Sequence, residues 1–333
     1  MVLILLLLVF LTAGCGLRAR SAGPQDDGRS EITTNGKRQL VLSSERSQVL
    51  IYFATVDKAY LVPVTIDINP TKEVAKVAVE KLLAGPNNDF VAPTIPEGTK
   101  LRDIYFSANS GTVYLDLTQD FLQLKDEQEV ELALASLTYT LAELPEVKRV
   151  QLSIDGEPIK ELHGVTLDQP LQKEHGVNLT GKKQEGQDEI RVFFGDENAM
   201  FLVPLTYAIP AGLTVPEKAQ EALELLAQGP PKDSSLNHVL WSGTKILSLE
   251  WQETEKLLTV NFSREFVGYG GGSAFEKQLV NSLVYTLTSL PGVHQVQILI
   301  EGERWDYLPE GTDIYKPLTR SSVGDKLNYS QPS

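Results

Sequence analysis

The side chains of this chain that could perform acid–base or metal chemistry are few and widely spaced. Its four histidines never stand at the spacing by which metal ligands recur; they are His163, His175, His238 and His294. The sequence has no G-x-S-x-G elbow for a nucleophilic serine and no Walker-type loop for a nucleotide phosphate. We therefore predict no catalytic residue, no metal and no cofactor, and we expect that the chain is not an enzyme.

One glycine-rich stretch, VGYGGGSAFE at residues 267–276, looks superficially like a dinucleotide-binding loop. Ser273 stands where the third glycine belongs, and the corresponding stretch earlier in the chain, LQLKDEQE, has no glycine. A loop that leads into a helix cap is the interpretation we prefer. An acid–base site made of paired carboxylates is not predicted either. Asp116 faces outward in its predicted strand and is replaced by Asn261 in the corresponding strand.

Cys15 is the only cysteine, so the chain cannot form an internal disulfide. It follows an apolar run. Val2–Leu11 has about half of the ~20 residues that a membrane-spanning helix needs, which is typical of a signal-peptide core. The residues up to Cys15 resemble the lipobox of bacterial lipoproteins, in which the cysteine receives a diacylglycerol thioether. The resemblance implies a signal peptide at 1–14 and fatty-acyl (palmitate) modification of Cys15; a plain signal peptide or a short hydrophobic N-terminus is the alternative. Residues 15–47 are rich in polar residues and predict a disordered tether.

Almost all of the remaining sequence occurs twice. LPEVKRVQLSIDG at 144–156 returns as LPGVHQVQILIEG at 290–302, and LVP at 61–63 returns at 202–204. LTYTL at 137–141 likewise returns as LVYTL at 283–287. A repeat of this length predicts two copies of one domain. We place them at 48–171 and 189–320, with a polar linker at 172–188 and a disordered tail at 321–333.

Each copy has the same predicted plan, which begins with two strands and a first helix. Two further strands, a second helix and a last strand follow. Pro63 or Pro204 lies in the second strand, and because proline cannot donate to a sheet, this strand is expected at an edge or a bulge. Box-like caps are predicted at three helix starts, namely Thr214 with Glu217, Asp126 with Glu129 and Ser273 with Glu276.

The apolar pattern of these elements predicts the core and the fold class. The second helices carry matching stripes, which are Leu134, Leu137, Leu141 and Leu144 in one copy and Val280, Leu283, Leu287 and Leu290 in the other. The predicted fold is α+β: a small, mostly antiparallel sheet with two helices packed on one of its faces, formed twice in tandem.

The repeated stretches also resemble a known module. AVEKLLAGP, GTKL, VYLDLTQDF and LTYTLAELPEV in the first copy are similar to the GerMN domain, and ALELLAQGP, LTVNFSREF and GSAFEKQLVNSLVYTLTSLPGV match it in the second. With a lipobox in front, the chain resembles the GerM-like sporulation and spore-germination lipoproteins. The resemblance implies a non-enzymatic protein related to the ring-building domains of the channel between mother cell and forespore. Cys15 is the only residue whose role it transfers.

These features predict a lipid-anchored protein on the extracytoplasmic face of the cell membrane. We expect it to act as a scaffold or assembly factor through other envelope proteins, ring-forming channel components among them, or through further copies of itself. The alternative is an envelope lipoprotein that binds a cell-wall fragment or small solute between the two copies. The net charge of −14 argues against a nucleic-acid partner.

The predicted surfaces indicate how such contacts could form. Strands that carry Pro63 and Pro204 are guarded edges, so contacts are expected through helix and sheet faces instead. The first helix of one copy is basic and that of the other is acidic, through Lys72, Lys76 and Lys81 against Glu217, Glu221 and Glu224. Such faces could dock head to tail, although two solvated helix faces are the interpretation we prefer.

Overall fold

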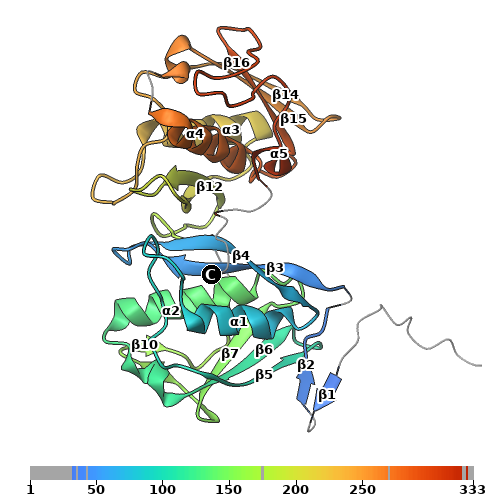
Figure 1. The fold of residues 1–333 in the computed structure, drawn as a ribbon, viewed down its shortest axis with the longest axis vertical. Coiled ribbons are helices and arrows are strands. Elements are labelled where there is room, and N and C mark those ends of the chain that lie inside the picture. Colours follow the sequence, from blue (N-terminus) through green and yellow to red (C-terminus); the bar gives the residue numbers. More distant parts are fainter. Residues whose placement is uncertain are drawn as a thin grey trace, which may run out of the picture.

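The structure of the protein is a computed structural model, which describes residues 32–34, 37–42, 44–173, 176–268, 271–324 and 328. Two similar units, copy 1 and copy 2, follow each other along the chain (Figure 1). Each consists of a β-hairpin, two helices and a sheet with three long strands. The predicted α+β class and the tandem duplication are confirmed.

Copy 1 starts with an antiparallel hairpin of β3 (Arg46–Ala54) and β4 (Leu61–Thr71). The long elements that follow are α1 (Val74–Ala84), β5 (Leu101–Ser107), β6 (Thr112–Leu117), α2 (Glu127–Leu141) and β7 (Arg149–Ile154). A 3-10 turn, Gln119–Gln123, precedes α2. Short strands complete the copy: β8 (Glu157–Pro158), β9 (Glu161–Leu162), β10 (Val165–Thr166) and β11 (Leu171–Gln172). A small hairpin of β1 (Ile32–Thr34) and β2 (Lys37–Gln39) precedes β3.

Copy 2 repeats this order of long elements. They are β12 (Gln187–Gly195), β13 (Leu202–Pro210), α3 (Val215–Gln228), β14 (Ile246–Gln252), β15 (Leu257–Phe262), α4 (Gly272–Leu287) and β16 (Gln295–Ile300). A 3-10 turn, Arg264–Val267, precedes α4, and a short helix, α5 (Arg320–Gly324), follows the sheet.

The two helices of each copy form a layer between the hairpin and the sheet (Figure 1). The predicted helix stripes are buried on this layer, with Leu137, Leu141, Leu283 and Leu287 all fully inaccessible. The prediction of a single sheet was incomplete, because β3 pairs only with β4 among the described strands and β12 only with β13. The chain passes from each hairpin directly into a helix, so the hairpin covers the second face of the helix layer.

One strand pair in each sheet departs from the antiparallel pattern. Strands β6 and β7 run parallel, as do β15 and β16, while β5–β6 and β14–β15 are antiparallel. Parallel neighbours need a long crossover connection, and α2 or α4 supplies it.

The predicted helix caps have three different outcomes. Glu217 accepts a hydrogen bond from the Thr214 N–H at 2.7 Å, so this capping box is confirmed. Asp126 accepts from the Glu129 N–H at 2.9 Å, which confirms half of the second box. The third box was wrong, because α4 begins at Gly272 and Glu276 instead accepts from the backbone N–H groups of Glu310 and Thr312 at 2.8 and 2.9 Å.

The folded part of each copy extends beyond the predicted boundaries. Leu42, expected in the tether, is 7% exposed, and its N–H donates to the Lys72 carbonyl at 3.0 Å. Val177, expected in the linker, is 3% exposed, and α5 lies in the segment expected to be a tail. These segments are too short to show an apolar period. The predicted signal peptide at 1–14 lies outside the described residues.

Candidate functional site

The strands at the outer edges of the two hairpins form hydrogen bonds with side chains outside the hairpin. In β3, the Tyr52 N–H donates to Thr140 Oγ1 at 3.1 Å, and the hydroxyl of Ser136 donates to the Tyr52 carbonyl. Both hydroxyls lie on α2, one turn apart, and both side chains are buried. The same two bonds recur in copy 2 among Phe193, Ser282 and Thr286. The helix therefore satisfies the strand edge as a neighbouring strand would.

The outer edge of β4 is closed by an asparagine side chain. The Leu61 N–H donates to Asn178 Oδ1 at 2.7 Å, and Asn178 Nδ2 donates to the Leu61 carbonyl at 2.8 Å. An opposite residue in an antiparallel ladder exchanges this same pair of bonds. Asn178 Nδ2 also donates to the Pro204 carbonyl of copy 2 at 2.8 Å. Because both amide donors and the acceptor are used, a carboxylate or a hydroxyl could not satisfy all three backbone groups.

Asn328 makes the same bonds with the roles of the copies exchanged. The Leu202 N–H donates to Asn328 Oδ1 at 2.6 Å, and Asn328 Nδ2 donates to the carbonyls of Leu202 at 2.7 Å and Pro63 at 2.8 Å. Asn178 and Asn328 also share a left-handed backbone, with φ of 53° and 50°, which asparagine tolerates better than most residues. We call these two residues the asparagine clamp.

The clamp joins the two copies through two equivalent sets of hydrogen bonds, related as they would be by a two-fold axis. Each asparagine holds the leucine of its own copy and bonds the proline carbonyl of the other copy. The two hairpins accordingly face each other in the middle of the molecule (Figure 1). The prediction of edge strands at Pro63 and Pro204 is confirmed. The expectation that contacts avoid these edges was wrong for the contact between the copies, because asparagine side chains reach the carbonyls that the prolines leave available.

Comparisons with known proteins agree with this doubled architecture. A family model described as "Germane: Sporulation and spore germination" matches residues 50–160 and again residues 191–306. The chain belongs to the Germane family. It is 26% identical over 352 residues to "Spore germination protein GerM" of Bacillus subtilis (strain 168), an alignment that covers 94% of this chain and 93% of that protein. The resemblance to GerM-like proteins with two tandem GerMN domains is confirmed.

A solved structure supports the Germane fold at the level of backbone architecture. The structure of the tandem GerMN domains of the sporulation protein GerM from Bacillus subtilis has a TM-score of 0.63 and 23% sequence identity. The match covers 83% of this chain and 99% of that chain, so it includes both copies.

The contact between the two Germane copies also contains ionisable side chains. Burial raises the pKa of Asp57, but hydrogen bonds from Thr55, Ser235 and two backbone N–H groups outweigh it, so the net pKa lies below its ordinary value. Ser235 belongs to copy 2. Burial raises the pKa of Tyr207 in β13 to about 12, and the neighbouring Tyr60 of copy 1 adds to the shift. A cleft of about 170 Å³ that Asp57 and Ser235 help to line is smaller than most ligand pockets.

A larger groove occurs at the equivalent place in each copy, between the turn of the hairpin and the second helix. We call it the hairpin–helix groove. Its volume is about 360 Å³ in copy 1, where Glu131, Tyr139 and Asn178 line it. In copy 2 its volume is about 260 Å³, and the equivalent lining residues are Lys277, Tyr285 and Asn328. Each groove is therefore bordered by a clamp asparagine, and the two differ in charge.

The carboxylates and glycines considered in the sequence have structural roles. Asp116 and Asn261 each accept a hydrogen bond at 2.8 Å, from the N–H of Gly156 and Gly302 respectively. Only a side-chain oxygen is needed to hold these turns, which explains why aspartate and asparagine interchange. In the glycine-rich loop, a Cβ on Gly268 would lie 2.1 Å from the ring of Trp241, so this glycine makes room for a side chain.

The other residues singled out in the sequence do not assemble into a reaction centre. Three histidines lie within the described residues, and no group of three or more His, Cys, Asp or Glu side chains there could hold a metal ion. His175 and Cys15 lie outside the described residues. Across the same part of the chain, no helix combines the length and apolar character needed to cross a membrane.

Proposed function

We propose that this Germane-family chain is a non-enzymatic scaffold of the cell envelope, anchored through lipid on Cys15 and acting in sporulation and germination by protein–protein contact. One observation carries the proposal: the polar side chains that recur at equivalent positions of the two copies form hydrogen bonds with backbone groups. The clamp asparagines, the helix hydroxyls and the Asp116–Asn261 pair all hold strands or turns. These side chains thus hold the backbone of each copy in place, and the two copies present two fixed surfaces to other proteins.

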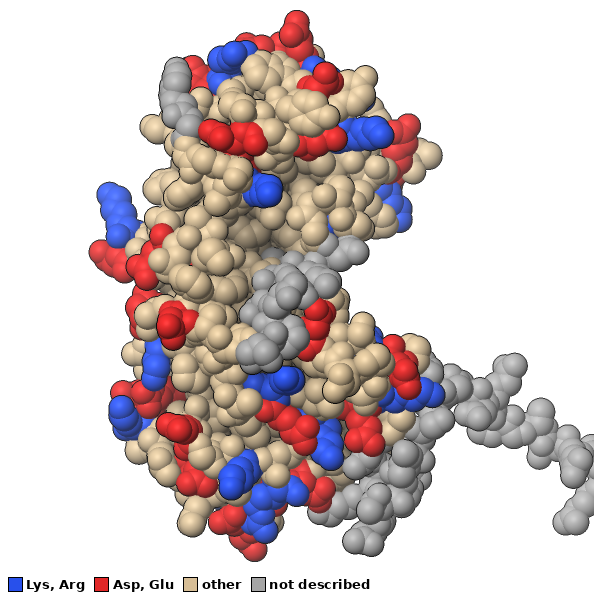
Figure 2. All heavy atoms as spheres, viewed as in Figure 1, with Lys and Arg blue, Asp and Glu red and all other residues tan. Residues whose placement is uncertain are grey.

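The surface has the mixed charge that suits specific protein contacts. Lysine and arginine lie among aspartate and glutamate over the face in Figure 2, without one extended patch of a single sign. Lys76 of the basic helix lies 4.0 Å from Glu80 of the same helix, which partly neutralises it. Head-to-tail docking through α1 and α3 therefore receives less support than contact through the hairpin–helix grooves.

Cross-linking at the grooves tests the scaffold. A photo-reactive residue at Leu179 or at Met200, which are 46% and 54% exposed beside the two grooves, is expected to capture defined envelope proteins in sporulating cells. Asn109, an exposed turn residue of copy 1, is the control position. Adducts that are the same at all three positions, or absent from both grooves, would reject the proposal. A shift in melting temperature with muropeptides instead would favour the alternative function, solute binding in a groove.

Replacement of Cys15 tests the anchor. Because one acyl chain binds membranes only marginally while two or more hold firmly, Cys15→Ala is expected to move most of the protein out of the membrane fraction or leave it as an unprocessed precursor. Labelling with a radioactive fatty acid should disappear in the same variant. A Cys15→Ala protein that is processed and fractionates like the wild type would show that the lipobox assignment is wrong.

A further inference from the structure

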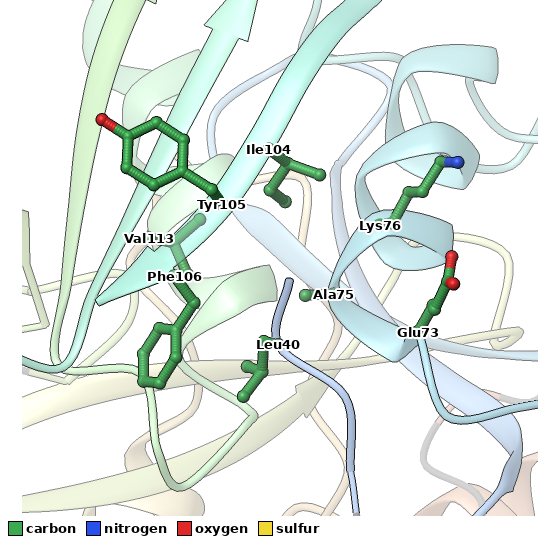
Figure 3. A pocket seen from close by; sticks show the side chains of 8 residues that line it. All are labelled: Leu40, Glu73, Ala75, Lys76, Ile104, Tyr105, Phe106 and Val113. Atoms are coloured by element: carbon green, nitrogen blue, oxygen red, sulfur yellow. The ribbon is translucent and has the colours of Figure 1, made fainter. Parts of the chain in front are cut away.

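The apolar space beneath the N-terminal segment of copy 1 is too small for a ligand. Leu40, Ala75 and Phe106 line a cavity there of only about 10 Å³ (Figure 3). That volume is about what one water molecule needs. A ligand is better accommodated by the charged side chains at the end of each second helix, where the two copies differ.

Copy 1 has a neutralised cation at the end of α2. Lys173 Nζ lies 5.3 Å from the centroid of the Tyr139 ring and 3.5 Å from the Glu143 carboxylate. The same carboxylate accepts a hydrogen bond from the Tyr52 hydroxyl at 2.9 Å. One cation, one anion and one hydroxyl donor therefore satisfy one another in copy 1.

Strand pairing and helix ends identify the equivalent residues of copy 2. Lys173 and Arg320 each come two residues after the leucine that pairs with the last long strand of their copy, β7 or β16. Glu143 and Ser289 each come directly after the residue that caps the second helix. Arg320 therefore corresponds to Lys173, and Ser289 corresponds to Glu143.

Copy 2 lacks the carboxylate at this place and has a second cation. Arg191 of β12 stands where β3 has Leu50, because both lie opposite a threonine at the same register of their hairpins. The exchange of Glu143 for Ser289 removes the anion. The cluster therefore changes from one positive and one negative side chain in copy 1 to two positive side chains in copy 2.

The two arginines meet at the end of α4. Arg320 Nε donates to Thr288 Oγ1 at 2.9 Å, and the guanidinium carbon lies 5.2 Å from the centroid of the Tyr285 ring. Ser289, the next residue, donates from its hydroxyl to the Arg191 carbonyl at 3.3 Å. Burial lowers the pKa of Arg320, and the charge of Arg191 lowers it further, so the two guanidinium groups are close enough to repel each other.

Neither Arg191 nor Arg320 has an acidic partner within the described residues. No carboxylate oxygen there lies within 4.0 Å of either guanidinium group. Glu189 stands two residues before Arg191 in β12, but its carboxylate accepts from the Gly176 N–H at 3.1 Å and lies 3.8 Å from Lys183 Nζ. Both arginines are half-buried, so two like charges are partly removed from water without a counter-charge. An added anion would offset this cost.

We propose that Arg191 and Arg320 bind a carboxylate of an interacting protein, at the place where copy 1 uses its own Glu143. The choice of a carboxylate follows from copy 1, in which the equivalent cation over the equivalent tyrosine is paired with one. Guanidinium groups bind carboxylates through paired, charge-assisted hydrogen bonds, which makes two arginines a specific receptor for this group. This inference deepens the scaffold proposal and rests on it for the source of the carboxylate.

Restoring the carboxylate of copy 1 tests the site on the full chain. Ser289→Glu should supply the missing anion from within the chain and raise the melting temperature. Ser289→Gln has the same length without the charge and should not raise it. Ser248→Glu, at an exposed serine of β14, makes the same charge change away from the site and is the matched control.

Nuclear magnetic resonance of the arginine Nε–H groups measures anion binding directly. A blocked Gly-Glu-Gly peptide at millimolar concentration should shift the signals of Arg191 and Arg320, and a blocked Gly-Gln-Gly peptide should not. The Nε–H signal of Arg102, which is already paired with Asp155 at 2.7 Å, should stay in place. Arg320→Gln should weaken binding by about tenfold or more, because hydrogen bonds to charged groups are the strong ones. Ser289→Glu should abolish it.

The outcomes separate this site from the scaffold proposal. No shift with the glutamate peptide, or a shift that Ser289→Glu leaves unchanged, would overturn the site. A shift with inorganic phosphate alone would overturn the assignment of a carboxylate. Binding of the glutamate peptide without cross-links at the grooves would reject a protein as the source of the carboxylate. Groove cross-links without anion binding would reject only this site, and the scaffold proposal would stand.

Discussion

Replacement of both clamp asparagines by aspartate is expected to uncouple copy 1 from copy 2. Aspartate has nearly the same shape and tolerates the left-handed backbone of Asn178 and Asn328, but its ionised form has no donor. The carbonyls of Leu61 and Pro204 would lose their partners and face a carboxylate instead. A buried acceptor left unpaired costs about 1–3 kcal/mol, so each substitution should destabilise the contact by roughly 3 kcal/mol.

Calorimetry and small-angle scattering measure this uncoupling. The wild type should unfold in one transition if the clamp couples the copies, and Asn178→Asp with Asn328→Asp should separate it into two and increase the radius of gyration. Asn109→Asp makes the same charge change on an exposed turn and is the control. Since each asparagine bonds both copies, the two single variants should have similar effects. A double variant that melts and scatters like the control would show that other contacts hold the copies together.

The features that could be predicted from the sequence are those that repeat with a regular period. Within each apolar stripe of α2 and α4, the residues are spaced one or two helical turns apart. The burial of these side chains could therefore be predicted from the local sequence pattern alone. Pro63 and Pro204 likewise indicated edge strands through a purely local property, the missing N–H. The separate hairpins could not be predicted, because the choice between one sheet and two depends on where the first helix packs.

The clamp could not be predicted because its partners are distant in the sequence. Asn328 lies 265 residues from Pro63, and Asn178 lies 117 residues from Leu61. The one signal was a doubled Asn-x-Thr/Ser, NLT at 178–180 and NYS at 328–330, within segments that were predicted to be a linker and a tail. Glu276 failed as a cap for the same reason, since the loop that it holds begins more than 30 residues later.

Thr140→Val is expected to destabilise copy 1, whereas Thr138→Val in the same helix is expected to have little effect. Both threonines are buried, and valine replaces each with nearly the same shape. Thr140 Oγ1 is the acceptor for the Tyr52 N–H, which would be left unpaired at a cost of about 1–3 kcal/mol. The Thr138 hydroxyl donates only to the Leu134 carbonyl within its own helix. Copy 2 has this combination of residues, because Val284 stands at the position of Thr138 and Thr286 at that of Thr140.

Urea unfolding and hydrogen exchange separate the two effects of Thr140→Val. A lower midpoint with an unchanged slope reports lost stability, and faster exchange of the Tyr52 N–H reports the lost bond itself. Thr140→Ser keeps the hydroxyl and should restore most of the protection, although it removes a methyl group. Adding Ser136→Ala should lower stability further, because the Tyr52 carbonyl then loses its partner as well. If Thr138→Val and Thr140→Val shift the midpoint equally, the strand edge is held by packing and the helix hydroxyls do not act as its missing neighbour.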